Sequence, residues 1–270
     1  MRRLSVILAI AATFVFCPCV VRAVTDDEGG VQRADEGREV LLARMTEYLN
    51  AMDTLPIPAA EAEVDYMISS IGDSLFRNTA AVEAYRHFRS SKYMGSENVA
   101  IHIYDKWFAS YRTVFDNIDE LDEAELYAFV NRRSLIGCKA PELLFEDADG
   151  DTLTVPSNSG RKSILFFYSV GCPKCLYISL TMSKYLNESN PDLDLYTIYT
   201  GEDDAAWHIY TERELKITAP STRVRHLRGG LTEYATAYGV IQTPRLFLVD
   251  ENGVIIGRNL DTEALSRLLE

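Results

Sequence analysis

The chain has 270 residues, of which 47% are hydrophobic and 25% are charged, and its 40 acidic and 27 basic side chains give a formal charge of −13. This is the composition of a globular protein, so a wholly disordered chain, a collagen-like fibre and a disulfide-dense mini-protein are excluded. Because so acidic a surface repels phosphate groups, we expect no nucleic acid partner and no general binding to anionic membranes.

The first residues have the pattern of a secretory signal peptide. Arg2 and Arg3 precede the apolar run Leu4–Phe16, and the side chains of Val21–Ala23 suit a cleavage site. The apolar run is shorter than the roughly 20 residues of a membrane-spanning helix, and no later segment approaches that length. We therefore predict that residues 1–23 are removed on export and that the mature chain has no transmembrane span.

Export would place the protein in the periplasm or cell envelope of a bacterium, where disulfides persist. Cys17 and Cys19 raise an alternative, in which one of them is acylated and anchors the protein as a lipoprotein. Because Phe16 and Pro18 are bulky or rigid just before each cysteine, we favour simple cleavage near Ala23.

A leader segment and a helical region follow the signal peptide. Residues 24–35 are polar and contain Gly29 and Gly30, which predicts a flexible leader. In residues 36–134, apolar side chains recur at helical spacing, which predicts about five helices packed as an all-α domain without recognisable catalytic residues. We interpret the apolar stripes as core; they are Leu41–Met52, Val64–Leu75, Val82–Phe88, Val99–Val114 and Leu126–Arg133.

Local signals mark helix ends in this domain. Pro56 and Pro58 separate the first stripe from the second. Asp122 and Glu125 have the spacing of a capping box and predict the start of the last helix.

Residues 135–270 have a different pattern, in which short apolar runs typical of strands alternate with helical segments. This order predicts an α/β fold with a mixed central sheet flanked by helices. Asp147–Gly150 and Glu251–Gly253 are typical of hairpin turns, and Asp261 is expected to cap the last helix. The predicted strands are 143–145, 152–155, 163–168, 193–199, 245–249 and 254–258, and the predicted helices are 173–187, 203–215, 231–238 and 261–270.

Cys172-Pro173-Lys174-Cys175 is the candidate site, because it follows a predicted strand and opens a predicted helix. Its three-residue offset on a first helical turn brings two sulfurs within bonding distance. The helix N-terminus and Lys174 both favour a thiolate, which is the attacking species in disulfide exchange. Pro173 suits a first turn, where its missing N–H would be unpaired anyway.

Other interpretations of the cysteines stay open. A structural zinc site needs a second pair of ligands at short spacing, whereas His208 and His226 are isolated. An inert disulfide that closes so short a loop would stabilise the fold little. Cys138 is the third cysteine of the predicted mature chain and is left over when Cys172 pairs with Cys175. It is expected to be a small buried hydrophobic residue, with a transient disulfide partner as the alternative.

A series of short motifs runs through the second half of the chain. The motifs are Gly137, Ala140-Pro141, Asp149-Gly150, Gly171-Cys172-x-x-Cys175, Ala237–Val240, Thr243-Pro244 and Asp250–Gly253. Together they resemble the TlpA/ResA-like branch of thioredoxin-fold proteins of bacterial envelopes. The resemblance covers Leu135 to Glu270, about half of the chain.

The resemblance implies a thioredoxin-like fold and thiol–disulfide oxidoreduction at a redox-active disulfide. Cys172 would be the nucleophile and Cys175 the buried resolving thiol. Pro244 would be the cis-proline that faces them, and the backbone of Thr243 would pair with an extended substrate peptide.

The chain departs from this family around the cysteines. Gly171 stands where the family often has tryptophan, and the middle dipeptide Pro173-Lys174 is neither Gly-Pro nor Glu-Pro. We assign this dipeptide to substrate binding and to tuning of the redox potential, which in this fold runs from about −270 to about −120 mV. Gly201-Glu202 is similar to a family step in which a carboxylate handles protons near the cysteines; the alternative for Glu202 is a helix first turn.

The basic residues near the predicted strands have either a functional or a purely structural interpretation. Arg245 follows Pro244 directly and either contacts an acidic substrate or only begins a strand. A basic cluster is interpreted as a solvent-exposed loop rather than as a docking patch; it consists of Arg223, Arg225, His226 and Arg228.

We therefore predict an exported thiol–disulfide oxidoreductase without a cofactor or metal. It would reduce, rather than oxidise, the cysteines of other envelope proteins, and a membrane thiol electron donor would regenerate it. The alternative is a non-catalytic envelope binding protein that uses the helical domain, with the thioredoxin-like half as scaffold. Peroxide reduction by Cys172 is a weaker third hypothesis.

Overall fold

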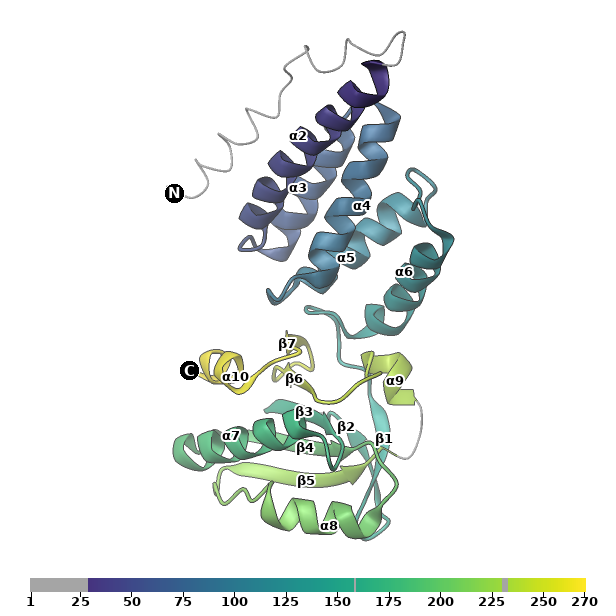
Figure 1. The fold of residues 1–270 in the computed structure, drawn as a ribbon. Helices are drawn as coiled ribbons and strands as arrows, with labels where there is room; N and C mark the ends of the chain where they lie inside the picture. The colour runs from purple at the N-terminus through teal and green to yellow at the C-terminus, as the bar shows by residue number, and fades with distance from the viewer. Residues whose placement is uncertain (1–28, 158, 230–232) are drawn as a thin grey trace. The chain divides into compact units, whose positions relative to one another are not determined.

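The computed structural model describes residues 29–157, 159–229 and 233–270, and it divides into two compact units at Glu125/Leu126 (Figure 1). The predicted signal peptide lies outside the described residues, as do the first residues of the predicted leader. The predicted domain boundary at residues 134/135 stays a prediction. Among the described residues, no helix combines the length and the apolar character needed to cross a membrane.

The first unit is helical, as the apolar stripes predicted. Buried side chains from the first four stripes form its core, among them Met45, Val64, Phe88 and Trp107. Helix α4 packs against its neighbours α2, α3 and α5. The helices are α2 (Gly29–Met52), α3 (Ile57–Ser70), α4 (Ser74–Ser90), α5 (Ser96–Ile103), which continues as a π-helical turn (Tyr104–Phe108), and α6 (Ile118–Asn131), which runs across the division between the units.

Three predictions for the helical region need correction. Helix α2 begins at Gly29, so residues 29–35 are helical rather than a flexible leader. This segment lacks proline, and a helix propagates readily from a packed nucleus such as the one around Met45. The fourth stripe ends at the π-helical turn, which shifts the later side chains off the buried face.

The start of α6 also differs from the prediction. The helix begins at Ile118, so Asp122 and Glu125 lie inside it and form no capping box. Asn117 supplies the cap instead, because its side-chain oxygen accepts the Asp119 N–H at 2.9 Å. The fifth stripe buries Val130 but leaves Leu126 and Phe129 exposed.

The second unit is built on a mixed seven-stranded sheet in the order β2-β1-β5-β4-β3-β6-β7 (Figure 1). Strands β3, β4 and β5 are parallel, and the other pairs are antiparallel. The strands are β1 (Leu143–Asp147), β2 (Thr152–Val155), β3 (Lys162–Tyr168), β4 (Leu193–Tyr199), β5 (Thr222–Arg228), β6 (Arg245–Val249) and β7 (Ile255–Arg258). The helices are α7 (Pro173–Ser189), α8 (Asp204–Arg213), α9 (Glu233–Tyr238) and α10 (Thr262–Leu269).

Both faces of this sheet are buried, which explains the dense apolar run of β3. Ile164 and Phe166 belong to one core cluster, which includes side chains of α7, α8 and α10. Leu165 and Phe167 belong to the other, which includes side chains of α9 and the β1–β2 hairpin. Helix α10 begins as predicted, because the Asp261 carboxylate accepts the Ala264 N–H at 2.7 Å.

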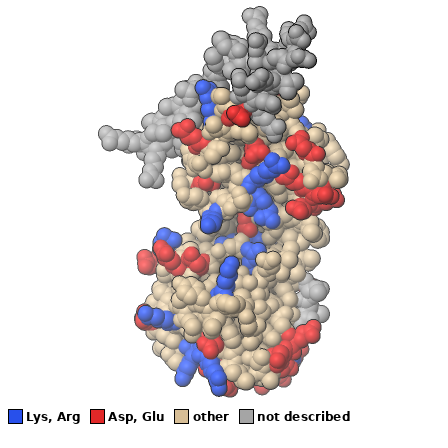
Figure 2. Space-filling view, in the orientation of Figure 1, with Lys and Arg blue, Asp and Glu red and all other residues tan. Residues whose placement is uncertain are grey.

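The basic cluster is strand β5 and not a loop, which corrects the prediction. Two of its arginines are paired with acids that lie far away in the sequence. The guanidinium of Arg223 binds Asp194 at 2.6 Å, and that of Arg228 binds Glu146 and Asp204 at 2.6 Å. Acidic and basic side chains lie interspersed on the visible surface of both units (Figure 2).

A buried arginine ties the segment before the sheet to the last strand. Arg258 donates to the backbone carbonyl of Ser134 at 2.7 Å and to the side-chain oxygen of Asn131. Its guanidinium also lies over the ring of Phe247, at 5.4 Å from the centroid. Residues 131–134 therefore pack as part of the second unit.

Candidate active site

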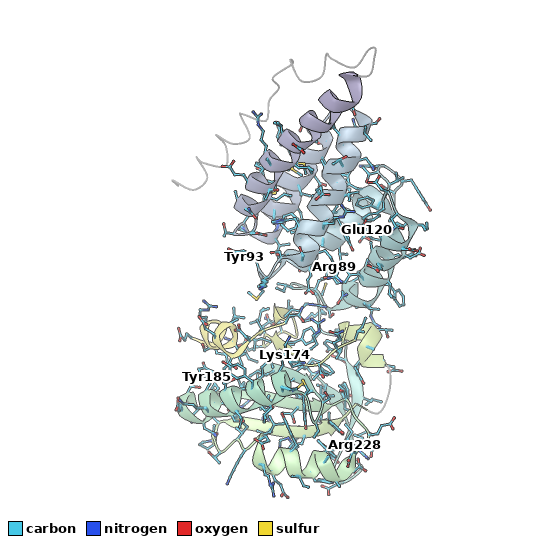
Figure 3. All side chains as sticks on the ribbon, viewed as in Figure 1. Arg89, Tyr93, Glu120, Lys174, Tyr185 and Arg228 are labelled. Atoms are coloured by element: carbon cyan, nitrogen blue, oxygen red, sulfur yellow. The ribbon has the colours of Figure 1, made fainter. Side chains whose placement is uncertain are left out.

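The Cys172 thiol lies between the end of strand β3 and the start of helix α7. Cys172 is the N-cap residue of that helix, and its sulfur accepts the Cys175 N–H at 3.2 Å. Pro173 occupies the first helical position, and Lys174 follows at the start of α7 (Figure 3). Cys172 is half-buried, whereas Cys175 faces the core and is fully buried. A thiolate at this position would gain from the free N–H groups and the helix dipole.

A second loop, far away in the sequence, meets the cysteines. The Thr243-Pro244 peptide bond is cis. The Cys172 thiol donates to the backbone carbonyl of Thr243 at 3.8 Å, and the hydroxyls of Thr243 and Ser169 lie 2.8 Å apart. The structure therefore brings together the two cysteines and the Thr243-Pro244 loop; their catalytic roles stay predictions.

The two thiols have opposite electrostatic environments. Desolvation acts against the Cys172 thiolate, but hydrogen bonds from the Cys175 thiol, from two backbone N–H groups and from Thr243 lower the pKa of Cys172 below its ordinary value. Desolvation by burial, together with the hydrogen bond to Cys172, raises the pKa of Cys175. Cys172 is thus the thiol that ionises first, and Cys175 keeps its proton.

An aromatic cluster with buried hydroxyls lies behind Cys175. The rings of Tyr168 and Tyr210 stack with 5.1 Å between centroids, and the hydroxyls of Tyr210 and Ser179 lie 3.0 Å apart. Desolvation raises the pKa of Tyr210 to about 12, so its hydroxyl keeps its proton at neutral pH. Sequence reasoning missed this cluster. The spacing of Ser179 from Cys175 along α7 was its one local signal, because residues four apart share a helix face.

The remaining predicted residues are exposed or half-buried. Glu202 is exposed and makes no hydrogen bond or ion pair with any residue that the structure describes. The cap of α8 is the next residue, Asp203, whose carboxylate accepts the Ala206 N–H at 2.9 Å. Arg245 begins β6 and donates to Asn259 at 2.5 Å. Cys138 is half-buried, which corrects the expectation of a buried thiol, and it donates to a backbone carbonyl at 3.8 Å.

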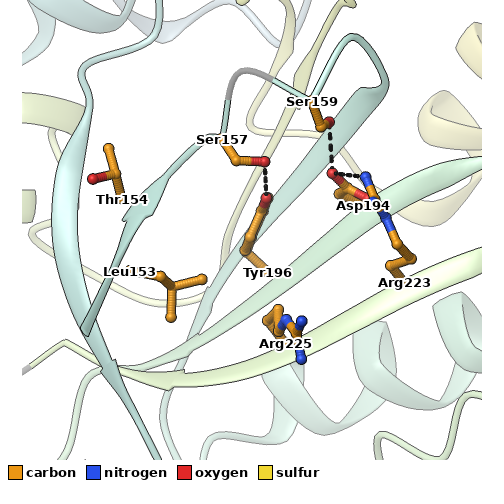
Figure 4. A pocket seen from close by; sticks show the side chains of 8 residues that line it. All are labelled: Leu153, Thr154, Ser157, Ser159, Asp194, Tyr196, Arg223 and Arg225. Carbon is orange, nitrogen blue, oxygen red and sulfur yellow. Dashed lines mark hydrogen bonds and ion pairs between the residues drawn. The ribbon is translucent and has the colours of Figure 1, made fainter. Parts of the chain in front are cut away.

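A cavity of about 420 Å³ lies on the sheet unit, and no cysteine lines it (Figure 4). The hydroxyls of Ser157 and Tyr196 lie 2.7 Å apart on its wall. Ser159 donates to Asp194 at 2.8 Å, and the same carboxylate binds Arg223. These bonds hold the loop after β2 on the sheet. Within residues 29–157, 159–229 and 233–270, no three potential metal ligands are grouped.

Comparison with solved structures identifies the fold. A thioredoxin-like protein from Bacteroides caccae is similar with a TM-score of 0.64 and 16% identity, over 86% of this chain and 83% of that chain. The thioredoxin domain of a thiol-disulfide oxidoreductase from Bacteroides vulgatus has a TM-score of 0.42 and 16% identity, over 50% of this chain and 98% of that chain. A thiol:disulfide interchange protein from Bacteroides sp. has a TM-score of 0.42 and 18% identity, over 51% and 90%.

No protein-family model matches the sequence, and no curated protein matches it. The first of these structural likenesses confirms the thioredoxin-like fold that the sequence motifs implied. Because it extends over 86% of the chain, it includes helical residues as well as the sheet.

Proposed function

We propose that the protein is a thiol–disulfide oxidoreductase that works through Cys172 and Cys175. The observation that carries the proposal is the asymmetry of the pair. One thiol is accessible at a helix N-terminus with a lowered pKa, and the other is buried with a raised pKa. An inert structural disulfide needs no such asymmetry, whereas an attacking and a resolving thiol do.

The exchange reaction follows from this geometry. The Cys172 thiolate attacks one sulfur of a substrate disulfide, which forms a mixed disulfide and releases the first substrate thiolate. The Cys175 thiol then passes its proton to that thiolate and attacks the Cys172 sulfur, which releases the second substrate thiolate. The protein ends as the Cys172–Cys175 disulfide, and two electrons have moved to the substrate.

The cis Thr243-Pro244 loop supports a role in substrate binding. It lies against the Cys172 thiol, so the Thr243 backbone is placed to pair with an extended peptide that reaches this thiol. An extended segment that carries the substrate disulfide would lie between this loop and the start of α7, in contact with Pro173 and Lys174. Both of these side chains are exposed there.

We place the reaction in the cell envelope and in the reducing direction. The signal-peptide pattern and the envelope resemblance support the location. In an oxidising compartment the pair rests as a disulfide, so a reductase needs a dithiol donor, which we assign to the membrane. Cysteines of envelope proteins are then the substrates.

Three serine variants of the exported chain, residues 24–270, test the proposal. Cys175→Ser should accumulate a mixed disulfide with a disulfide-linked peptide, because the resolving thiol is missing. Cys172→Ser should accumulate none and lose all exchange activity, and Cys138→Ser is the matched control that should behave as wild type. A trapped adduct in the Cys172→Ser variant, or undiminished activity there, would rule the mechanism out.

The potential of the pair decides the direction. Equilibration in defined thiol buffers should give a value toward the thioredoxin end, near about −270 mV. A value near about −120 mV would make the protein an oxidant and reverse the electron flow.

A further inference from the structure

The helical unit contains an apolar cavity of about 470 Å³, which is within the size range of ligand sites. It lies between the π-helical turn, the segment that follows it and the first turns of α6. The side chains that line it are mostly aromatic or aliphatic and include Tyr104, Phe108, Val114, Phe115, Ile118 and Leu121.

The walls of this cavity are fixed by packing. The rings of Phe108 and Phe115 stack with 3.9 Å between centroids, and Tyr85 meets both of them edge-on. Glu120, which is labelled in Figure 3, lies on α6. It binds Arg86 of α4 through two bonds of 2.7 and 2.8 Å. Because its walls are already ordered, a ligand would pay little entropy to organise this site.

The rim of the cavity exposes large apolar side chains. Tyr111 is 87% exposed, Ile118 68% and Val114 60%. Tyr111 also has a φ of +58°, a left-handed conformation that non-glycine residues adopt at a cost. Contiguous exposed apolar groups around a cavity are typical of interaction sites. Single exposed apolar residues would need no explanation.

A buried hydroxyl in the cavity has no partner. Only 5% of the surface of Thr113 is exposed, and its hydroxyl oxygen forms no hydrogen bond with any described residue. Burying a hydroxyl without a partner is unfavourable, so such groups call for a ligand or a water. The hydroxyl can both donate and accept, which suits a peptide backbone.

The charge around the rim indicates what kind of ligand fits. Asp116–Glu125 contains six acidic residues and no basic one. Most of the carboxylates of this segment are exposed. Its apolar residues are Ile118 at the rim, Leu121 in the cavity wall and the buried Ala124. Cations that flank an apolar group would therefore be attracted to this side of the cavity.

We propose that this cavity binds an apolar side chain of an extended polypeptide segment that carries lysine or arginine on both sides. The apolar side chain fills the cavity between Phe108 and Ile118. The Thr113 hydroxyl bonds to the backbone of the segment, and its basic side chains face the carboxylates of α6. This inference does not rest on the proposed redox reaction, because no cysteine takes part.

A labelled peptide tests the proposal by fluorescence anisotropy on the exported chain. The probe has a Leu-Phe-Leu centre with two lysines on each side, and two matched peptides carry glutamate for lysine or serine for the apolar centre. The lysine peptide should bind saturably and more weakly as salt rises, and the other two should bind at least about tenfold more weakly. Equal binding of all three peptides, or no binding of the first, would overturn the proposal.

Variants locate the site. Val114→Ser combined with Ile118→Ser should weaken binding about tenfold, and both positions are exposed, so folding should persist. Val40→Ser, at an exposed apolar position on α2, is the matched control and should change nothing. Thr113→Val removes the hydroxyl but keeps the shape, so it should weaken binding several-fold and leave thermal stability equal or higher.

Two outcomes of the variant series count against the site. Unchanged affinity in Val114→Ser/Ile118→Ser would place binding elsewhere. Loss of affinity in Val40→Ser of equal size would indicate non-specific adsorption. A Cys172→Ser/Cys175→Ser protein should bind the peptide as wild type does, so failure of the redox proposal and failure of this one are separate results.

Discussion

In each unit, a polar side chain with several partners joins segments that are far apart in the sequence, but the two residues differ in chemistry. In the sheet unit, Arg258 is 4% exposed and donates to neutral acceptors on Asn131 and Ser134. In the helical unit, Asp65 of α3 accepts from Trp107 and His102 at 2.9 Å and from Lys106 at 2.5 Å. The side chain of Asp65 is 17% exposed.

This contrast predicts different responses to acid. Arg258 bonds to uncharged acceptors, whereas Asp65 is itself the carboxylate of its network. Desolvation opposes ionisation of Asp65, but its three donors hold the pKa of Asp65 below the ordinary 3.8. A carboxyl whose folded pKa is lowered stabilises the fold above the unfolded pKa and loses that contribution as pH falls through the folded pKa.

The largest effect is expected when Arg258 is removed. Arg258→Ala should lower the free energy of unfolding by about 3 kcal/mol, because buried acceptors on two residues lose their donor. Urea unfolding followed by circular dichroism measures it. Arg267→Ala, an exposed arginine of α10, is the control and should stay within about 0.5 kcal/mol of wild type. A similar loss of unfolding free energy in both variants would mean that the buried bonds of Arg258 add no particular stability.

Replacing Asp65 should have a smaller effect that depends on pH. Asp65→Asn keeps the shape but removes the charge, and should cost about 2 kcal/mol at pH 7. The difference from wild type should shrink as pH falls below 3.8, where the native carboxyl also becomes neutral. Urea unfolding at several pH values measures both. A difference that stays constant down to pH 2.5 would contradict the linkage.

Thiol chemistry gives the sheet unit a pH dependence of its own. Cys172 should react with iodoacetamide at pH 7 about tenfold faster than Cys138, because hydrogen bonds lower the pKa of Cys172. The reaction rate of Cys172 should fall as pH is lowered, and the midpoint of this fall should lie below the ordinary thiol pKa of 9.0. Peptide mass spectrometry after timed quenching separates the two sites. Equal rates would remove the argument for an activated Cys172.

The smallest effect is expected behind the cysteines. Tyr210→Phe leaves the buried Ser179 hydroxyl without its partner and should cost about 1 kcal/mol. Thermal unfolding is sufficient to detect this. Tyr185→Phe on the same helical layer is a matched change that breaks no described hydrogen bond and should be close to neutral. A neutral Tyr210→Phe would show that the hydroxyl pair adds no stability.

The sheet was predictable where burial on both faces leaves a dense apolar run. Strands β4 and β6 have the bounds that the sequence predicted, and β3 differs by one residue. Strand β5 was not predictable, because Arg223 and Arg228 are paired with acids from other strands, Asp194 and Glu146. In the helical unit, the π-helical turn broke a regular stripe, and no local pattern announces such a turn.

The candidate site divides in the same way. Cys172, Cys175 and the Thr243-Pro244 step carry motifs, so they could be singled out from the sequence. The Tyr210 and Ser169 hydroxyls carry none, because their relevance arises only when α8 and the cis-proline loop pack near the cysteines. Glu202 was singled out by a motif, yet in the structure it lies exposed and unbonded among the described residues.

The chain has two tryptophans, and each unit holds one of them. Trp107 donates to Asp65 in the helical unit, whereas Trp207 stacks on Tyr199 in the core cluster that contains Cys175. The molecule therefore has two tryptophan fluorophores, one in each unit. In a Trp107→Phe protein, tryptophan emission would report the core cluster that contains Cys175, and in a Trp207→Phe protein it would report the helical unit.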